Sequence, residues 1–225
     1  MHIEPGIVTG AKLILSYATA AGALSVTSKI VLQNCRKASG LAALLLRSLI
    51  TTALVLCFFQ ALPHPPVGVS EVHLILGTTL FLLFGAAPAA VGLAAGLLIQ
   101  GLFFAPFDLP QYGMNVTTLL VPLFAIDRLA RRIIAPNTRY ADITYKQALT
   151  LSVAYQGGIV SWVAVWSFYG YGVSWHTLTA LSSFGVAYMS VVLIEPLIDL
   201  GMLAVAKTLR HKNTSLLLNQ RLYWS

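Results

Sequence analysis

The chain has 225 residues, of which 57% are hydrophobic and only 9% are charged, and its mean hydropathy is +0.79. Soluble domains carry about 25% charged residues, so this composition excludes an ordinary soluble protein and indicates a polytopic membrane protein. The net charge of +7 does not indicate nucleic-acid binding, because the basic residues lie at the ends of apolar spans, where membrane orientation explains them.

The first element is a six-residue tail, Met1 to Gly6, that leads directly into an apolar span. Histidine in second position places an α-amine, a peptide nitrogen and an imidazole within one residue of each other, so three nitrogens can enclose one metal ion. A histidine at this position is otherwise ordinary in a chain end. The tail has no positive region and the apolar segment is too long for a signal peptide, so we expect the amine to persist in the mature protein.

Apolar spans follow along the chain, and the one at 72–107 is too long for a single crossing. Gly85 followed by Pro88 is typical of a turn and of the first turn of a new helix, so we divide this span there. The sequence therefore predicts an all-α membrane protein whose single compact bundle, residues 1–206, has seven transmembrane helices. Their predicted ranges are 7–32, 41–62, 72–84, 88–107, 114–134, 146–169 and 178–206.

The basic residues predict the orientation of this bundle. With seven crossings and the N-terminus outside, 12 of the 14 basic residues face inward, namely Lys29, Arg36, Lys37, Arg128, Arg131, Arg132, Arg139, Lys146, Lys207, Arg210, Lys212 and Arg221. Six crossings would leave a strongly basic segment outside, against the positive-inside rule. We predict a multi-pass protein of the inner (cytoplasmic) cell membrane with a basic cytoplasmic tail at residues 207–225.

His73, at the outer start of the predicted third helix, lies on the same side of the membrane as the N-terminus. A lone histidine at a helix start is usually a hydrogen-bonded or surface residue, but the short tail could fold back to reach this one. The Met1 amine, the amide nitrogen and imidazole of His2, and the His73 imidazole would then provide four nitrogen ligands. Such a set suits square-planar or tetragonal Ni(II) or Cu(II), and its affinity should rise with pH because metal displaces the amine proton.

Two further patterns have more than one interpretation. Gly92 and Gly96 indicate close helix packing, either within the bundle or against a partner membrane protein. Glu195 and Asp199 lie four residues apart at membrane depth, where ionisable groups suggest a proton relay, a cation path, or a structural pair with Arg47 or a nearby polar face. We favour structure or partner coupling, with both acids in the inner half and far from the outer histidines.

Three segments together resemble one known family. They are Met1-His2-Ile3 followed by an acidic residue and Gly6, Val72-His73-Leu74 leading to Gly85, and Gly113-Met114-Asn115. They are similar to the CbiM/NikM family, the substrate-binding membrane components of energy-coupling-factor cobalt and nickel transporters. The resemblance covers the first 135 residues well and the rest loosely.

The resemblance implies that Met1, His2 and His73 hold the metal, with His64, Ser70 and Asn115 orienting these ligands from behind. The chain departs from the family in the order of residues 4–6, and at Glu71, where a small polar residue is expected. It also lacks the histidine expected ahead of Glu195.

The function implied is capture of Co²⁺ or Ni²⁺, as transported substrate, for an ATP-driven importer, with no catalytic activity in this chain. No Gly-x-x-x-x-Gly-Lys-Ser/Thr run is present, so ATP hydrolysis is expected in partners. These are a transmembrane coupling subunit, two ATPase subunits and a small accessory membrane subunit in the lipid bilayer; no nucleic acid is expected.

Two alternatives remain at this point. The chain could be a membrane substrate-binding subunit or transporter for a small organic substrate such as a vitamin, with a pocket lined by Trp162, Trp166, Tyr169 and Trp175. These aromatic residues are explained more simply as an interfacial belt. An intramembrane enzyme is the other alternative, but no His-Glu-x-x-His or Gly-x-Ser-x-Gly motif is present.

Overall fold

The computed structural model describes residues 3, 6–35, 40–62 and 66–208. Within these ranges the chain forms seven α-helices, with bounds α1 Leu13–Cys35, α2 Gly40–Ala61, α3 Gly77–Phe84, α4 Ala86–Phe103, α5 Tyr112–Ile133, α6 Tyr145–Tyr171 and α7 Trp175–Thr208. Three 3₁₀ turns accompany them: η1 Gly10–Lys12 before α1, η2 Pro106–Gln111 between α4 and α5, and η3 Tyr140–Asp142 between α5 and α6. The strands β1 Pro66–Val67 and β2 Ser70–Glu71 pair as an antiparallel hairpin.

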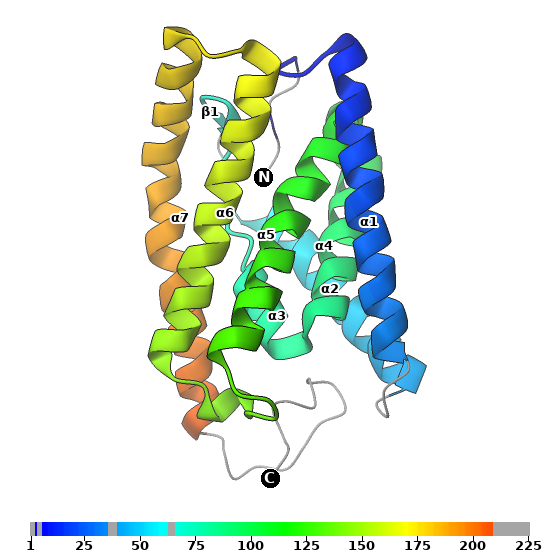
Figure 1. Cartoon of the computed structure of the whole chain (residues 1–225), viewed down its shortest axis with the longest axis vertical. Coiled ribbons are helices and arrows are strands. Elements are labelled where there is room, and N and C mark those ends of the chain that lie inside the picture. Colours follow the sequence, from blue (N-terminus) through cyan, green and yellow to red (C-terminus); the bar gives the residue numbers. More distant parts are fainter. Residues whose placement is uncertain (1–2, 4–5, 36–39, 63–65, 209–225) are drawn as a thin grey trace.

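The helices form one elongated bundle. α6 and α7 lie side by side at one edge, α1 lies at the other, and α4 and α5 stand between them, with α2 packed on α4 (Figure 1). The hairpin, η1 and the turn between α6 and α7 lie at one end of the bundle. The end of α5, η3 and the end of α7 lie at the opposite end (Figure 1).

Five helices are long and apolar enough to cross a membrane, namely α1 with η1, α2, α4, α6 and α7. α5 is also 22 residues long. Its polar residues Asn115, Asp127 and Arg128 lower its hydropathy. α3 has only eight residues, which rise about 12 Å against a hydrocarbon core of about 30 Å.

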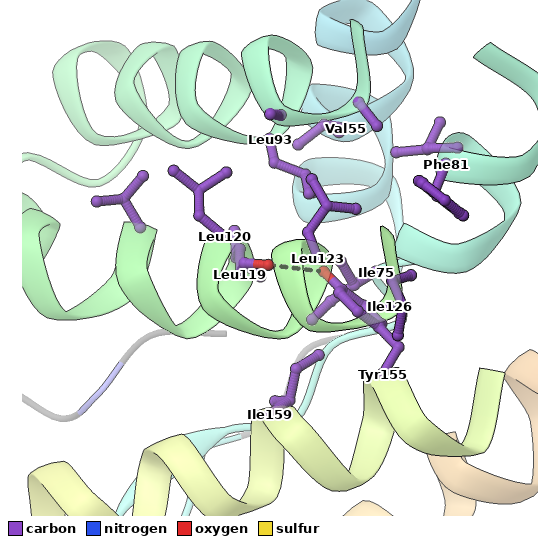
Figure 2. Close-up of a cluster of buried hydrophobic side chains, with 14 of the residues drawn as sticks. Val55, Ile75, Phe81, Leu93, Leu119, Leu120, Leu123, Ile126, Tyr155 and Ile159 are labelled. Atoms are coloured by element: carbon purple, nitrogen blue, oxygen red, sulfur yellow. Dashed lines mark hydrogen bonds between the residues drawn. The ribbon is translucent and has the colours of Figure 1, made fainter. Parts of the chain in front are cut away.

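The core lies along α5, which packs against α4 on one side and against α6 on the other (Figure 2). Leu93, Leu119 and Ile159 are fully buried there, and the Tyr155 hydroxyl donates to the Leu119 carbonyl at 3.4 Å. Five helices, α1, α2, α4, α6 and α7, bury the stripe that faces their neighbours and leave large apolar side chains on the outside, as a bilayer-embedded bundle does.

Gly92 and Gly96 let α4 lie directly against α2. A Cβ added at Gly92 would lie 2.4 Å from the Thr51 hydroxyl, and one added at Gly96 would lie 2.6 Å from a Val55 methyl group. The pair therefore serves packing within the bundle, which is the first of its two interpretations.

The segment predicted as the third helix, 72–84, is helical in its second part, 77–84, but not in residues 72–76. α3 begins only at Gly77, and residues 72–76, which we call the strap, run without helical structure from the hairpin to α3. The strap turns into α3 at Leu76, whose φ of 53° lies in the left-handed region. The break at Gly85 is confirmed, since this residue has φ 92° and ends α3 just before α4 begins.

Candidate metal site

The N-terminal segment is anchored inside the bundle at Ile3. This side chain is fully buried, and its backbone N–H donates to the Asn115 Oδ1 atom of α5 at 2.8 Å. Ile3 also forms an isolated antiparallel bridge with Ser70 of the hairpin. The backbone immediately after His2 is therefore held between the start of α5 and β2.

His73 lies on the strap, not on a helix as predicted. Its side chain is buried, with 1% of the residue exposed, and its Nε2 atom lies 2.8 Å from Glu71 Oε2. The ring also meets Phe59 of α2 edge to face, with centroids 5.1 Å apart. A carboxylate accepts an N–H, so in the neutral tautomer that fits this contact Nε2 carries the hydrogen and Nδ1 the lone pair.

Of the predicted site residues, the structure brings Ser70, Asn115 and His73 into one region. Ser70 and Asn115 both contact Ile3, and Ser70 precedes His73 by three residues on the same segment. Met1, His2 and His64 lie outside the described residues, so the four-nitrogen set stays a prediction. Within the described ranges, no three His, Cys, Asp or Glu side chains lie close enough to hold a metal ion.

Glu195 is the residue of this region whose position the sequence reasoning missed. Its Oε1 accepts from the backbone N–H groups of Ile75 and of Leu76, the latter at 2.9 Å. Its Oε2 accepts from the Gln156 side-chain amide of α6. We expected this acid to lie far from the histidines, but it contacts the strap two residues after His73.

Asp199, one turn further along α7, binds α3. It accepts from the Thr79 hydroxyl. Tyr140, in η3 beyond the membrane-spanning helices, lies near Asp199. Burial, and then the nearby Asp199 carboxyl, raise the pKa of Tyr140 above its ordinary value of 10.0, so this phenol is neutral.

The contact between Glu195 and the strap could have been expected from one rule: backbone that is not helical needs hydrogen-bond partners elsewhere in the protein. An extended segment at membrane depth must have its N–H and C=O groups satisfied by protein. A buried acid is a good acceptor for such groups, and Glu195 has this role for Ile75 and Leu76. Predicting a helix for 72–84 concealed the requirement, because a helix satisfies its own backbone.

The four aromatic residues considered for an organic pocket have different environments. Trp166 is buried and lies edge to face with Tyr169 at 5.9 Å between centroids. Trp162 donates from Nε1 to the Thr117 hydroxyl of α5 at 3.1 Å. Trp175 is 83% exposed at the start of α7, as expected for an interfacial residue.

The apolar helices and buried core define a polytopic membrane protein. Residues 2–213 match the family model described as the cobalt uptake substrate-specific transmembrane region, and the chain belongs to this family, CbiM. The protein is therefore a membrane component of metal uptake rather than a catalytic enzyme.

Two solved structures share the fold. One, described as the crystal structure of a transition metal transporter, has a TM-score of 0.68 and 19% identity, with 95% of each chain covered. The other, a truncated transition metal transporter, has a TM-score of 0.65 and 17% identity, over 95% of this chain and 100% of the other. No curated protein matches the chain.

Proposed function

We propose that the protein captures Co²⁺ or Ni²⁺ on the outer side of the cell membrane, as the substrate-binding subunit of an ATP-driven energy-coupling-factor importer. The ligands are the Met1 amine, the amide nitrogen and imidazole of His2, and the His73 imidazole. The observation that carries the proposal is the anchoring of Ile3. Its hydrogen bond to Asn115 and its pairing with Ser70 hold the residue after His2 against the hairpin that leads to His73.

The contact between Glu71 and His73 supports the ligand role of His73. A metal-binding imidazole usually donates its second N–H to a carboxylate, which fixes the ring and raises its basicity. Glu71 accepts at Nε2 in this way, so Nδ1 is the nitrogen suited to the metal. Four nitrogens suit Ni(II) and are acceptable to Co(II), and preference between them depends on site geometry and metal supply.

The bundle supports seven crossings with the N-terminus outside. The strap contributes about 16 Å and α3 about 12 Å, so together they cross a core of about 30 Å as one segment. Arg131 lies in the last turn of α5, Arg139 directly before η3 and Lys207 in the last turn of α7. These basic residues belong to the end of the bundle that we assign to the cytoplasm. Residues 1–206 then form the bundle and 207–225 a basic cytoplasmic tail.

In the part of the chain that the structure describes, Lys12 is the basic residue at the opposite end, and a local contact accounts for it. Its Nζ donates to the carbonyls of Tyr169 at 3.1 Å and Gly170 at 2.8 Å. These carbonyls lie at the C-terminus of α6, where a helix favours a positive charge. Lys12 therefore stabilises a helix end and does not argue against the proposed orientation.

Energy for transport comes from partners, because the sequence has no phosphate-binding loop. We assign these partners as a transmembrane coupling subunit, two ATPase subunits and a small accessory membrane subunit. Together they would release the ion to the cytoplasm, which places the protein in the inner (cytoplasmic) membrane.

The experiment is a calorimetric titration of the purified full chain in detergent with Ni²⁺ and with Co²⁺. One variant carries a single extra residue before Met1, and the other is His2→Ala. Both should lose high-affinity binding, because the first moves the amine out of the chelate and the second removes an imidazole. The matched control is Asp127→Asn, which breaks an exposed ion pair with Arg131 at the other end of the bundle. Binding by the extended chain as tight as by the native chain would reject the proposed ligands.

A further inference from the structure

The Glu195 carboxyl divides its two oxygens between two elements. Oε1 accepts from both Ile75 and Leu76 of the strap, and Oε2 accepts from Gln156 of α6. The residue is 1% exposed. All three contacts use the oxygens as acceptors, so the group joins the strap to α6 and α7 from inside the bundle.

The strap needs this support at the point where Glu195 binds it. Leu76 adopts φ 53° and ψ 32°, a left-handed conformation that is unfavourable for a residue other than glycine. Such a conformation persists only where the surroundings hold it. Since His73 and Ile75 are two residues apart, at most about 7 Å of chain separates the fixed N–H of Ile75 from the imidazole-bearing backbone.

Glu195 is itself held in place on its other side. The Gln156 amide that donates to Oε2 also accepts, through its Oε1, from the Tyr188 hydroxyl at 2.5 Å. Tyr188 is fully buried and stacked on Phe184 with centroids 5.3 Å apart. The acceptor for the strap is therefore a fixed point of the α6–α7 pair.

We propose that Glu195 is a positioning residue for metal capture, holding the backbone of the strap so that the His73 imidazole is presented at the metal site. The proposal rests on the proposed function, since it assumes that His73 is a ligand. The positioning role requires a side chain long enough to place an oxygen acceptor at the N–H groups of the strap. The negative charge of Glu195 has no part in it.

Two conservative variants separate the effect of side-chain length at position 195 from the effect of its negative charge. Glu195→Gln keeps an oxygen in the place of Oε1, and the Gln156 amide can rotate to pair with the new amide. Glu195→Asp keeps the charge but shortens the side chain by one methylene, so its oxygens withdraw from Ile75 and Leu76. The matched control is Asp199→Ala, which removes a similarly buried carboxyl one turn along α7 that binds α3 and not the strap.

The measurements are calorimetric Ni²⁺ affinity, the ligand-field absorption of bound Ni²⁺, and thermal unfolding of each full-length variant. We expect Glu195→Asp to weaken binding about 10–100-fold, as loss of a ligand-orienting group does, and to shift the absorption band. Glu195→Gln should bind within about threefold of the native chain with an unchanged band. Asp199→Ala should lower the unfolding temperature yet keep the native band and affinity.

Several results would overturn the inference. One is a Glu195→Asp variant with the affinity and absorption band of the native chain. Another is a loss of Ni²⁺ affinity in Glu195→Gln, or in Asp199→Ala, as large as the loss in Glu195→Asp. If Glu195→Asp does not fold, the double exchange Glu195→Gln with Gln156→Glu decides. This exchange preserves every hydrogen bond while moving the charge to α6, so it must bind like the native chain.

The inference and the proposed function fail in different ways. Suppose that the native chain binds metal, His73→Ala does not, and Glu195→Asp binds as the native chain does. This outcome rejects only the positioning role. The proposed site and the positioning role are both rejected if the native chain binds neither Ni²⁺ nor Co²⁺. They are also both rejected if His73→Ala binds metal as tightly as the native chain.

Discussion

Glu71 is the residue at which this chain departs most clearly from its family resemblance, and the structure gives it a place in the site. A small polar residue was expected there, but the carboxylate lies 2.8 Å from His73 Nε2 with its side chain 18% exposed. A carboxylate in this position selects one imidazole tautomer and makes the ring a stronger ligand. The departure therefore strengthens the proposed ligand role of His73.

Replacing Glu71 should weaken metal binding without removing a ligand. We expect Glu71→Ala to lower Ni²⁺ affinity about 10–100-fold, because the imidazole loses its orienting acceptor. The measurement is a calorimetric titration, with Asp127→Asn as the control. In a His73→Ala background the same substitution should have no further effect. An equal loss in both backgrounds would show that Glu71 does not act through His73.

Metal affinity should also rise with pH in the native chain. The proposed amine ligand is protonated below its ordinary pKa of about 7.7–8.0, and metal binds only the deprotonated form. As the pH is lowered, the apparent affinity should therefore fall about tenfold per pH unit for each proton displaced. The fall should be steeper below about pH 6.5, where imidazoles also protonate. Titrations between pH 6 and 9 test this, and an affinity independent of pH would exclude the amine.

Among the secondary-structure elements, α3 is the one whose placement decides where the strap ends. Gly77, its first residue, lies against the ring of Tyr155 of α6, where an added Cβ would be only 2.3 Å away. Tyr155 is fully buried and its hydroxyl donates to Leu119. A larger residue at position 77 would therefore clash with a buried, hydrogen-bonded ring, which favours glycine at the start of α3.

Gly77→Ala should destabilise the bundle at this contact. We expect a loss of at least about 1–3 kcal/mol, typical of overpacking, seen as a lower unfolding temperature in detergent. The control is Gly157→Ala on the exposed face of α6, where an added methyl group meets nothing within 4 Å. That variant should be at least as stable as the native chain, because alanine favours a helix interior more than glycine does. Equal stability of Gly77→Ala would contradict the packing described.

The whole molecule has two ends of different chemistry, and this makes its orientation testable. In a chain with Cys35 and Cys57 replaced by serine, Val173→Cys lies in the exposed turn between α6 and α7, and Pro136→Cys lies in the exposed loop after α5. A membrane-impermeant maleimide should label the first variant in cells whose inner membrane is intact and accessible. It should label the second only after that membrane is opened. The opposite pattern would reverse the proposed orientation.

Much of the fold could be predicted because the bilayer limits what a sequence can form. α2 and α6 begin and end within two residues of the predicted ranges 41–62 and 146–169, and the break at Gly85 is present. Apolar length, glycine and proline are local signals, and each of these features depends on them. The candidate residues His73, Ser70 and Asn115 were likewise recognisable from short segments.

The sequence by itself determined the class of protein, its helical spans and its candidate ligands, because composition, apolar length and side-chain chemistry are properties of the chain alone. Only the tertiary structure decided that residues 72–76 form a strap and that Glu195 supports it. A short run of apolar residues has the same composition whether it is helical or extended, so the sequence does not distinguish the two. What permits the extended form is an acceptor about 120 positions away in the chain, on α7, which only folding brings to Ile75 and Leu76.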